Sequence, residues 1–412
     1  MSNRFQAPRG TFDILPELEE ARTRIERIAR EVLGSAGYGR IETPVLEDTS
    51  LFQRGVGEST DIVRKEMFSL TDQGDRSLTL RPEGTAAICR AYVEHGMHRL
   101  PQPVKVWYQG PFFRQERPQA GRYRQFTQIG AEAIGSDSPL VDAELIIGLS
   151  DLLGRLEVPG VLLRLSSLGS PDSRAAYRAE LTAYLSDHAD ELHPDVRDRI
   201  ATNPLRAFDA ADEGTRRVMA DAPRMVDRLS IDDSEHFAEV RHLLDAEGIA
   251  YELDGTLVRG LDYYTRTVFE FTCDALGAQS GIAGGGRYDR LVAELGGPET
   301  PAAGWAAGIE RILLALGDQQ AVPPRDVYVV AGDDAARAKA FALALELRRH
   351  GMRAECDLAG RSVKGQFKQA DRLGARQAVV LENGGSATVR DMAAGTQREV
   401  PIARLVTELR GL

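Results

Sequence analysis

Apolar residues recur at helical spacing near the beginning of the chain. Pro16 suits the first turn of a helix, and Gly34 suits its end. Between them lies one apolar stripe, made of Leu18, Ala21, Ile25, Ile28 and Val32. The pattern therefore predicts a helix over 17–33. Residues 39–47 then indicate an extended segment, because Pro44 keeps the residue before it out of the helical region.

Further along the chain, several segments carry the pattern of strands. Residues 77–81 indicate a short strand, and a helix is expected to begin directly after them. Residues 104–116 and 123–135 indicate two longer strands around a polar loop. We expect these strands to pair antiparallel, with polar side chains along one face of the sheet. Such a face is where a sheet can carry a site.

The composition changes between residues 170 and 248, which are rich in Ala, Asp, Glu and Arg at helical spacing. Because β-branched runs are few there, we interpret this segment as a helical insertion. Strand character returns over 257–271. A glycine turn that leads into a helix is expected over 281–295, and a strand followed by a helix over 301–316.

Two prolines at 323–324 mark a domain boundary. Beyond them strand-like and helix-like segments alternate, with helices expected over 334–350 and 361–373. This alternation predicts a small α/β domain with a largely parallel sheet. The predicted organisation comprises a core in two parts, an insertion and a C-terminal domain: 1–169 and 249–320, 170–248, and 325–412.

The composition is that of an ordinary globular protein. Its 412 residues are 42% hydrophobic and 27% charged, which suffices for two or three domains with separate cores. The first residues contain no apolar signal-like stretch, and no apolar run reaches about eighteen residues. Cys89, Cys273 and Cys356 are too scattered for a disulfide framework or a zinc site. We therefore expect a cytoplasmic protein with no membrane partner.

The distribution of charge leaves an RNA partner open. The net charge of −11 argues against nucleic-acid binding at first. Residues 325–412, however, hold 15 basic and 11 acidic side chains, a net +4, so the remainder carries −15. A mildly basic domain on an acidic body is compatible with local RNA binding, although many domains of this charge bind nothing.

The sequence contains no phosphate-binding glycine loop. No lysine directly follows a glycine, which excludes a P-loop, and the glycines at 284–286 lack the spacing of a dinucleotide fingerprint. His95 and His98 lack the acidic or cysteine partners of a metal set, so a solvated helix end explains them more simply. Any nucleotide must be held by arginines, whose guanidinium groups pair with phosphate oxygens in a bidentate manner.

Residues 113–132 form a candidate site. Gln128, Gly130 and Glu132 share one face of the predicted strand, because side chains alternate with a period of two. The glycine leaves space between the two polar side chains. A solvent-facing strand is the alternative, but the glycine favours a floor on which something lies close.

Residues 257–267, with the sequence LVRGLDYYTRT, form a second candidate site. Arg259, Asp262, Tyr263 and Tyr264 fall within this short string. A core strand does not normally bury so many polar groups in one place. A loop that serves only to solvate the chain does not need two adjacent aromatic residues.

This string resembles the first histidine-specific signature of the histidyl-tRNA synthetases, a family of class II aminoacyl-tRNA synthetases. Other segments resemble the remaining signatures of that family, in the same order along essentially the whole chain. They are RIETPVLED at 40–48 (motif 1), TLRPEGTA at 79–86, FRQERPQAGRYRQFTQIGAE at 113–132 (motif 2), GGGRYD at 284–289 (second histidine signature) and AAGIERILL at 306–314 (motif 3). The HIGH-like and KMSKS-like signatures of class I enzymes are absent.

The resemblance implies that three arginines hold the phosphates of ATP. Arg114 would contact the α-phosphate and the substrate carboxylate region, Arg259 the α-phosphate and Arg311 the γ-phosphate. On a lone helix, Arg311 would otherwise be taken for a surface salt bridge. Mg²⁺ is expected with ATP, bridging its outer phosphates, and the sequence names no protein ligand for it.

The resemblance also implies residues that bind histidine and tRNA. The acceptors for the α-ammonium group would be Glu83, Thr85 and Gln128. The partners of the imidazole would be Glu132 and Tyr264, with Tyr263 and Tyr288 as pocket walls. The acceptor end of the tRNA would meet Arg117 and Gln119. Glu83, expected on an exposed loop, could instead be a charge at a helix N-terminus.

The implied fold is α+β, with the antiparallel-sheet catalytic domain of class II synthetases, a helical insertion and a C-terminal α/β anticodon-binding domain. The implied reaction joins L-histidine to tRNA(His) through histidyl-adenylate, in a homodimer that pairs through residues 17–47. For the apolar stripe of 17–33, a packed core face is the alternative. One departure occurs at 203–214, where Ala-Ala replaces an expected lysine, and it puts RNA contacts of the insertion in doubt.

Two alternatives to this function remain. One is the regulatory subunit of ATP phosphoribosyltransferase, a non-catalytic paralogue that would sense histidine. That family lacks an anticodon domain and has a degraded 257–267 signature, and both are intact in this chain. The other is a class II synthetase of prolyl or threonyl type, against which Glu132 together with Tyr264 argues.

Overall fold

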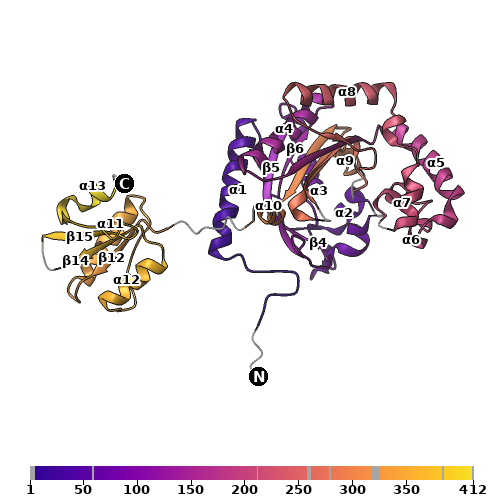
Figure 1. Ribbon diagram of the computed structural model, residues 1–412. Coiled ribbons are helices and arrows are strands. Elements are labelled where there is room, and N and C mark those ends of the chain that lie inside the picture. The colour runs from indigo at the N-terminus through magenta and orange to yellow at the C-terminus, as the bar shows by residue number, and fades with distance from the viewer. Residues whose placement is uncertain are drawn as a thin grey trace. The chain divides into compact units, whose positions relative to one another are not determined.

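The computed structural model describes residues 5–57, 60–210, 212–257, 261–277, 280–317, 324–382 and 385–410. It divides into two compact units, Met1–Gln320 and Ala321–Leu412 (Figure 1). Among the described residues, no helix is both long enough and apolar enough to cross a membrane. The mixture of helices with mixed sheets confirms the expected α+β class.

In the described residues of the first unit, eight strands form one sheet in the order β1-β5-β6-β11-β10-β9-β7-β8. The central strands pair antiparallel, whereas β1 with β5 and β7 with β8 pair parallel at the two ends. The strands are β1 (Gly39–Arg40), β5 (Val104–Phe113), β6 (Gln125–Ile134), β7 (Val161–Ser167), β8 (Glu252–Leu253), β9 (Thr265–Cys273), β10 (Gly281–Arg287) and β11 (Ala302–Gly308).

Helices cover one face of this sheet and enclose the main core. The helices that contribute are α1 (Pro16–Ser35), α4 (Pro139–Arg155), α8 (Ile231–Ala246) and α10 (Ile309–Leu316). On β6, Ile129, Ala131 and Ala133 point into this core, so Gln128, Gly130 and Glu132 lie on the opposite face. That opposite face is where the candidate site lies. Three further helices group together there: α2 (Thr49–Val56), α3 (Thr85–Glu94) and α9 (Leu291–Glu294) (Figure 1).

Helix α1 begins and ends close to the predicted residues. Pro16 occupies its first turn, and Ile25, Ile28 and Val32 of the predicted stripe are buried. They pack in the main core of their own chain. The stripe therefore packs in the core of its own chain, which was the alternative to a dimer contact.

For residues 281–295 the predicted helix is confirmed by α9, but the predicted glycine turn before it is wrong. Residues Gly281–Arg287 form β10, an interior strand between β9 and β11. The glycines are required by close approach of the neighbouring strands: a Cβ on Gly285 would lie 2.2 Å from the carbonyl oxygen of Gly304 and 2.8 Å from the ring of Phe269. A run without side chains has no alternation, so its strand character could not be recognised.

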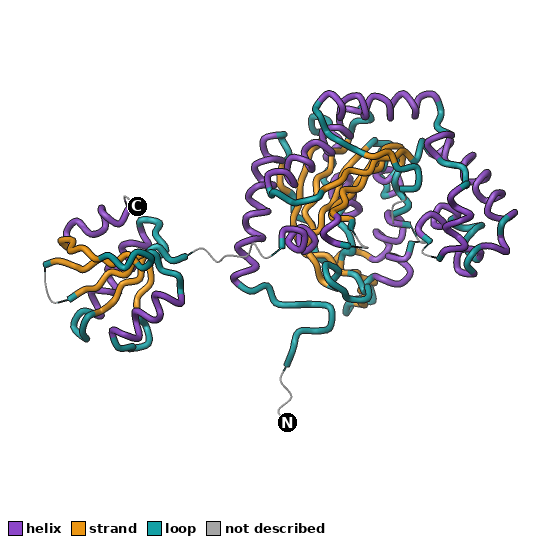
Figure 2. The backbone as a smooth tube through the Cα atoms, viewed as in Figure 1, coloured by secondary structure: helices purple, strands orange, loops and turns teal. Residues whose placement is uncertain are grey.

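A small sheet and the insertion complete the first unit. The small sheet has the order β2-β4-β3, with strands β2 (Leu46–Asp48), β3 (Phe68–Thr71) and β4 (Ser77–Leu80). The helices of the insertion are α5 (Pro171–Asp187), α6 (Pro194–Arg197), α7 (Glu213–Ala220) and α8. Tyr177, Leu181 and Met219 belong to a separate apolar core within this insertion. Figure 2 shows the insertion as helices and loops beside the strands.

The second unit holds a mixed sheet with helices on both faces. Its strands are β12 (Val327–Ala331), β13 (Ala354–Cys356), β14 (Gln377–Leu381), β15 (Ser386–Asp391) and β16 (Gln397–Pro401). Helices α11 (Arg337–Arg349) and α13 (Ile402–Arg410) pack on one face, and α12 (Val363–Arg372) on the other. The prediction of a largely parallel sheet is wrong, because β14, β15 and β16 pair antiparallel. The polar, glycine-containing segment around β15 gave no strand signal.

Candidate active site

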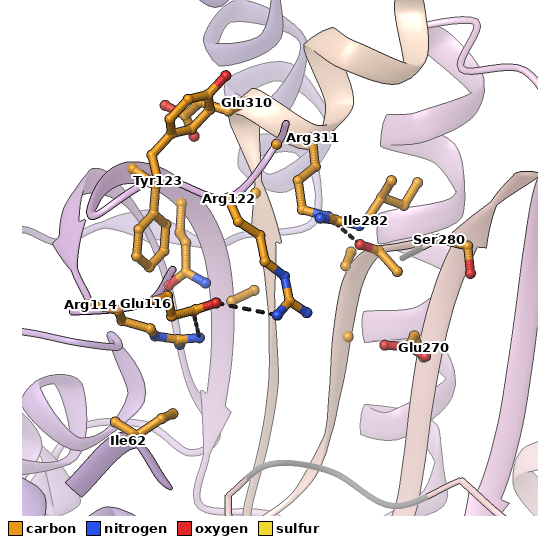
Figure 3. Close-up of a pocket in the computed structure, with 18 of the residues that line it drawn as sticks. Ile62, Arg114, Glu116, Arg122, Tyr123, Glu270, Ser280, Ile282, Glu310 and Arg311 are labelled. Atoms are coloured by element: carbon orange, nitrogen blue, oxygen red, sulfur yellow. Dashed lines mark hydrogen bonds and ion pairs between the residues drawn. The ribbon is translucent and has the colours of Figure 1, made fainter. Parts of the chain in front are cut away.

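A polar cavity of about 730 Å³ opens on the face of the large sheet that lies opposite the main core (Figure 3). It is lined by strands β6, β9, β10 and β11, by the loop between β5 and β6, and by the beginning of α10. Among its lining residues are three predicted site residues, Gln128, Arg114 and Arg311. Glu83, Thr85, Glu132 and Tyr264 are all buried outside its lining.

Glu132 is fully buried in the middle of β6. Its Oε1 accepts a hydrogen bond from the Thr85 hydroxyl at 2.8 Å, and its Oε2 accepts one from the Tyr288 hydroxyl at 2.6 Å. Burial away from water raises the pKa of Glu132 to about 8, against the opposing effect of these two hydrogen bonds. Burial therefore favours the protonated form of this carboxyl group.

A cluster of tyrosines surrounds Glu132. The rings of Tyr263 and Tyr264 lie 4.8 Å apart, and those of Tyr263 and Tyr288 lie 5.6 Å apart. Tyr288 was expected only as a pocket wall, yet it donates the hydrogen bond to Glu132. Its side chain emerges after β10, whose strand character the sequence did not indicate. The second histidine signature, at 284–289, therefore contacts the candidate site at 113–132 through the Tyr288 hydroxyl.

Glu83 does not lie on an exposed loop; it is only 4% exposed. Its two carboxylate oxygens accept hydrogen bonds from the backbone N–H groups of Thr85 at 2.7 Å and Ala86 at 2.9 Å. Glu83 thus satisfies free donors at the N-terminus of α3, as the alternative interpretation had it. Burial nevertheless raises the pKa of Glu83.

Gln128 and Tyr108 present unsatisfied polar atoms beside Glu132. The Oε1 atom of Gln128 and the hydroxyl of Tyr108 are buried and have no hydrogen-bond partner among the described residues. Tyr108 lies on β5 directly opposite Gly130. A Cβ on Gly130 would lie 2.4 Å from the Tyr108 hydroxyl oxygen, so this glycine makes room for the tyrosine ring. Tyr108 was not among the predicted site residues, because its place depends on the strand that pairs with β5.

Arginines from two elements meet at the cavity (Figure 3). Arg114, at the end of β5, donates from Nε to the Pro82 carbonyl oxygen at 2.9 Å, and its guanidinium lies over the Phe126 ring. Arg311 projects from α10 and donates to the Gly281 carbonyl oxygen. Desolvation lowers the pKa of Arg311. The two sequence-predicted phosphate residues are thus held by carbonyl groups at opposite walls of one cavity.

The loop between β5 and β6 is closed by backbone hydrogen bonds. Gln119 and Arg122 exchange N–H···O bonds of 3.0 Å and 2.9 Å. Arg117 and Gln119 are exposed on this loop, whereas the Arg122 guanidinium forms an ion pair with Glu116 at 3.2 Å on the cavity wall. Arg122 was not among the predicted site residues. Arg259, the third predicted phosphate residue, lies outside the described residues.

The cavity carries carboxylates as well as arginines. Glu116 and Glu270 line it, and both are labelled in Figure 3. The described part of the chain has no group of three or more His, Cys, Asp or Glu side chains that could hold a metal ion. Such a cavity suits a polyphosphate that brings its own Mg²⁺, because Mg²⁺ in phosphate sites keeps waters and needs only one or two carboxylates.

A buried cluster of an acid and phenols lies on the same sheet face as the arginine-lined cavity. The first can recognise a small molecule that has several hydrogen-bonding groups, and the second can hold phosphates. No nucleophile beside a general base is needed for phosphates and a carboxylate to react, provided that they are aligned and their charge is neutralised.

Comparisons with known proteins identify relatives along the whole chain. The family model described as histidyl-tRNA synthetase matches residues 10–312, and the model described as anticodon binding domain matches residues 326–412. The "Histidine--tRNA ligase" of Thermosynechococcus vestitus is 47% identical over 98% of this chain and 96% of its own length. That of Desulforamulus reducens is 48% identical over 97% of each.

A solved structure, apo histidyl-tRNA synthetase of S. aureus, is similar with a TM-score of 0.83 and 36% identity, covering 99% of this chain and 100% of that one. These matches extend through the C-terminal unit, and the full-length relatives carry the name of a ligase. The regulatory-subunit alternative is therefore not favoured.

Proposed function

The chain belongs to the histidyl-tRNA synthetase family and acts as a histidine–tRNA ligase, and on this basis we propose how its residues carry out the reaction. The reaction activates L-histidine with ATP to histidyl-adenylate and pyrophosphate, and then transfers histidine to the 3′ end of tRNA(His). ATP is a substrate. The proposals concern the roles of individual residues, the Mg²⁺, the dimer and the compartment.

Histidine is bound by the pocket around Glu132. An imidazole N–H replaces one of the two hydroxyl groups that donate to Glu132. The other imidazole nitrogen forms a hydrogen bond with Tyr264. Gln128, whose Oε1 is buried without a partner among the described residues, accepts from the α-ammonium group together with Thr85. Because Glu83 holds the N-terminus of α3, it places Thr85 and adds negative charge near the ammonium group.

ATP lies in the arginine-lined cavity. Arg114 binds the α-phosphate and Arg311 the γ-phosphate, and Arg259 adds a further cation at the α-phosphate. The histidine carboxylate attacks the α-phosphorus in line and pyrophosphate leaves, with the arginines neutralising charge that develops on the phosphorane. Mg²⁺ would neutralise the outer phosphates, with Glu116 and Glu270 as the carboxylates available to it.

The assignment of the histidine-binding site depends most on Glu132. This carboxyl group is fully buried beside a polar cavity, and a binding function explains that burial. We expect Glu132→Gln to raise the KM for histidine in pyrophosphate exchange by about 10–100-fold, the loss of one hydrogen bond to a charged group. The KM for ATP should change little. Equal changes in both KM values would make Glu132 a structural residue.

The pH dependence provides a control for the same variant. Ionised Glu132 accepts the imidazole N–H, and its fraction grows as the pH rises through the raised pKa of about 8. In the unaltered protein, the KM for histidine should therefore fall between about pH 7 and 8.5, over and above the titration of free histidine. Glu132→Gln removes this contribution.

The protein forms a homodimer, although the stripe of α1 is occupied within its own chain. The small β2-β4-β3 sheet leaves Leu46 42% exposed and Leu70 44% exposed, and its strand β2 belongs to the motif 1 region. We expect light scattering at micromolar concentration to give the mass of two chains. Replacing both leucines by aspartate should yield monomers, and a monomeric unaltered protein would contradict the proposal.

Arg117 and Gln119, exposed on the β5–β6 loop, contact the acceptor end of tRNA, while the second unit binds the anticodon. The protein works in the cytoplasm, where reduced thiols persist. Cys89, Cys273 and Cys356 are consistent with that compartment, since all three are buried and none forms a disulfide in the described part of the chain.

A further inference from the structure

Three parts of the insertion make polar contacts with one short segment of the catalytic core, residues 262–266. From α5, Nη1 of Arg174 donates to the Tyr264 carbonyl oxygen at 2.8 Å and to that of Asp262 at 3.4 Å. Before the 3₁₀ turn Pro204–Asp209, Nδ2 of Asn203 donates to the Asp262 carboxylate at 3.4 Å. The third contact comes from α8, where the Asp233 carboxylate accepts from Nε of Arg266 at 3.2 Å.

Residues 265 and 266 of this segment begin β9, and the core holds Arg266 through backbone hydrogen bonds with Leu168 at 2.7 Å and Gly169 at 2.8 Å. Residues 262–264 precede the strand. Arg266 has a φ of 45°, a conformation that residues other than glycine rarely adopt. Pairing between β9 and β10 is irregular here, where the register shifts between Gly286 and Arg287. On its other side, the Asp262 N–H donates to the Val56 carbonyl oxygen at the end of α2. Side chains of the insertion therefore hold the backbone on both sides of Tyr264, in addition to the hydrogen bonds that the core makes with this segment.

We propose that the insertion positions Tyr264 for histidine binding and that Arg174 is its principal positioning residue. Arg174 bridges the carbonyl groups on either side of Tyr263, so it fixes the backbone from which the two tyrosine rings project. This inference rests on the proposed role of Tyr264 at the imidazole. It gives the insertion a function in amino-acid recognition that does not depend on RNA contacts.

A coupling follows from this arrangement. If the insertion stabilises the histidine-binding position of Tyr264, histidine must in turn stabilise the attachment of the insertion, because linkage between two sites is reciprocal. Histidine should therefore slow amide hydrogen exchange at the beginning of α5, around Arg174. This effect should be lost when Arg174 can no longer reach the carbonyl groups.

Arg178 provides a matched control, one turn further along α5. It also donates to a backbone carbonyl oxygen, that of Thr202 at 2.8 Å, but this partner lies within the insertion. Both arginines border the same cleft between the insertion and the core. Replacement of either by methionine keeps an unbranched apolar stem and removes the donors. The two arginines differ in the segment that they contact, and Arg178 is also the more exposed.

The test compares Arg174→Met, Arg178→Met and Tyr264→Phe in the full chain by histidine-dependent pyrophosphate exchange. We expect Arg174→Met to raise the KM for histidine about tenfold, the effect of one lost hydrogen bond from a charged donor, with the KM for ATP within about twofold. Arg178→Met should leave both KM values within about twofold. Arg174→Lys, which keeps a cationic donor, should recover part of the loss.

Each outcome is decisive. If Tyr264→Phe raises the KM for histidine and Arg174→Met does not, the positioning role is wrong while the proposed site stands. If Tyr264→Phe itself has no effect, the proposed role of Tyr264 fails first. If Arg174→Met does not fold, Asn203→Ala and Arg174→Lys replace it, and unchanged KM values for histidine in both would overturn the inference. The slowing of amide hydrogen exchange at α5 by histidine should disappear in the variants whose KM for histidine rises.

Discussion

Replacing Arg114 with alanine should lower the rate of histidine-dependent pyrophosphate exchange by about 10²–10³-fold, the usual effect of removing one preorganised group that stabilises a developing charge. The side chain of Arg114 is 21% exposed and borders the cavity. Its Nε is fixed by the Pro82 carbonyl oxygen, and the Phe126 ring supports the guanidinium plane. The donor fork is therefore oriented before ATP arrives.

Two further variants test whether this loss belongs to the phosphate site. Arg114→Lys should remain strongly impaired, because an ammonium group cannot offer two parallel donors to a phosphate. Arg117→Ala, on the same loop but exposed, should leave exchange within about twofold and weaken only tRNA charging. By the same argument, Arg259→Ala should abolish adenylate formation. Near-normal exchange in a folded Arg114→Ala variant would remove Arg114 from the reaction.

Deleting the second unit, Ala321–Leu412, should separate the two steps of the reaction. Histidine-dependent pyrophosphate exchange should stay within about twofold, because each unit has an apolar core of its own. Charging of tRNA(His) should fall by about 10²–10⁴-fold. Two binding modules on one chain that engage one partner gain about this factor in affinity, and the deletion removes that gain.

The charge of residues 325–412 gives this prediction a second measurement. These residues carry a net +4 against −15 for the remainder, so binding of tRNA by the full chain should weaken with salt as counterions are released from phosphates. Footprinting should show protection of the anticodon by the full chain. Protection confined to the acceptor stem, with normal charging by the truncated chain, would mean that this unit has no RNA contact.

Regular periodicity made several elements predictable from the sequence. Helix α1 begins at Pro16, one residue before the predicted start, because a stripe at helical spacing and a proline suited to the first turn agree. Strands β5 and β6 lie within the predicted segments, and the period of two along a strand predicted that Gln128 and Glu132 share a face. Long elements with one buried face leave such a signal in the sequence.

Features that depend on contacts distant in sequence were not predictable. Strand β10 has glycines where neighbouring strands approach closely, and glycines give no alternation. Tyr108 enters the site because Gly130 on the paired strand makes room for its ring. Glu83 is buried because α3 begins directly after it and offers two free N–H donors. In each case the partner, not the residue itself, determines the environment.

The contacts between the insertion and residues 262–266 belong to the same class. Arg174, Asn203 and Asp233 are separated along the insertion, and nothing in its composition indicates that they meet one segment. Sequence analysis could assess the insertion only for RNA contacts, through the missing lysine near 203–214. The fold brings the three side chains together and links the insertion to histidine recognition.

Pyrophosphate exchange measured with each of the twenty amino acids tests the central claim most directly. A site in which Glu132 and Tyr264 hold the two imidazole nitrogens leaves buried polar groups unpaired with any other side chain, so discrimination of about 10⁴–10⁵ is expected. We expect histidine alone to support exchange. Comparable exchange with a second amino acid, or no exchange with histidine in the presence of ATP and Mg²⁺, would contradict it.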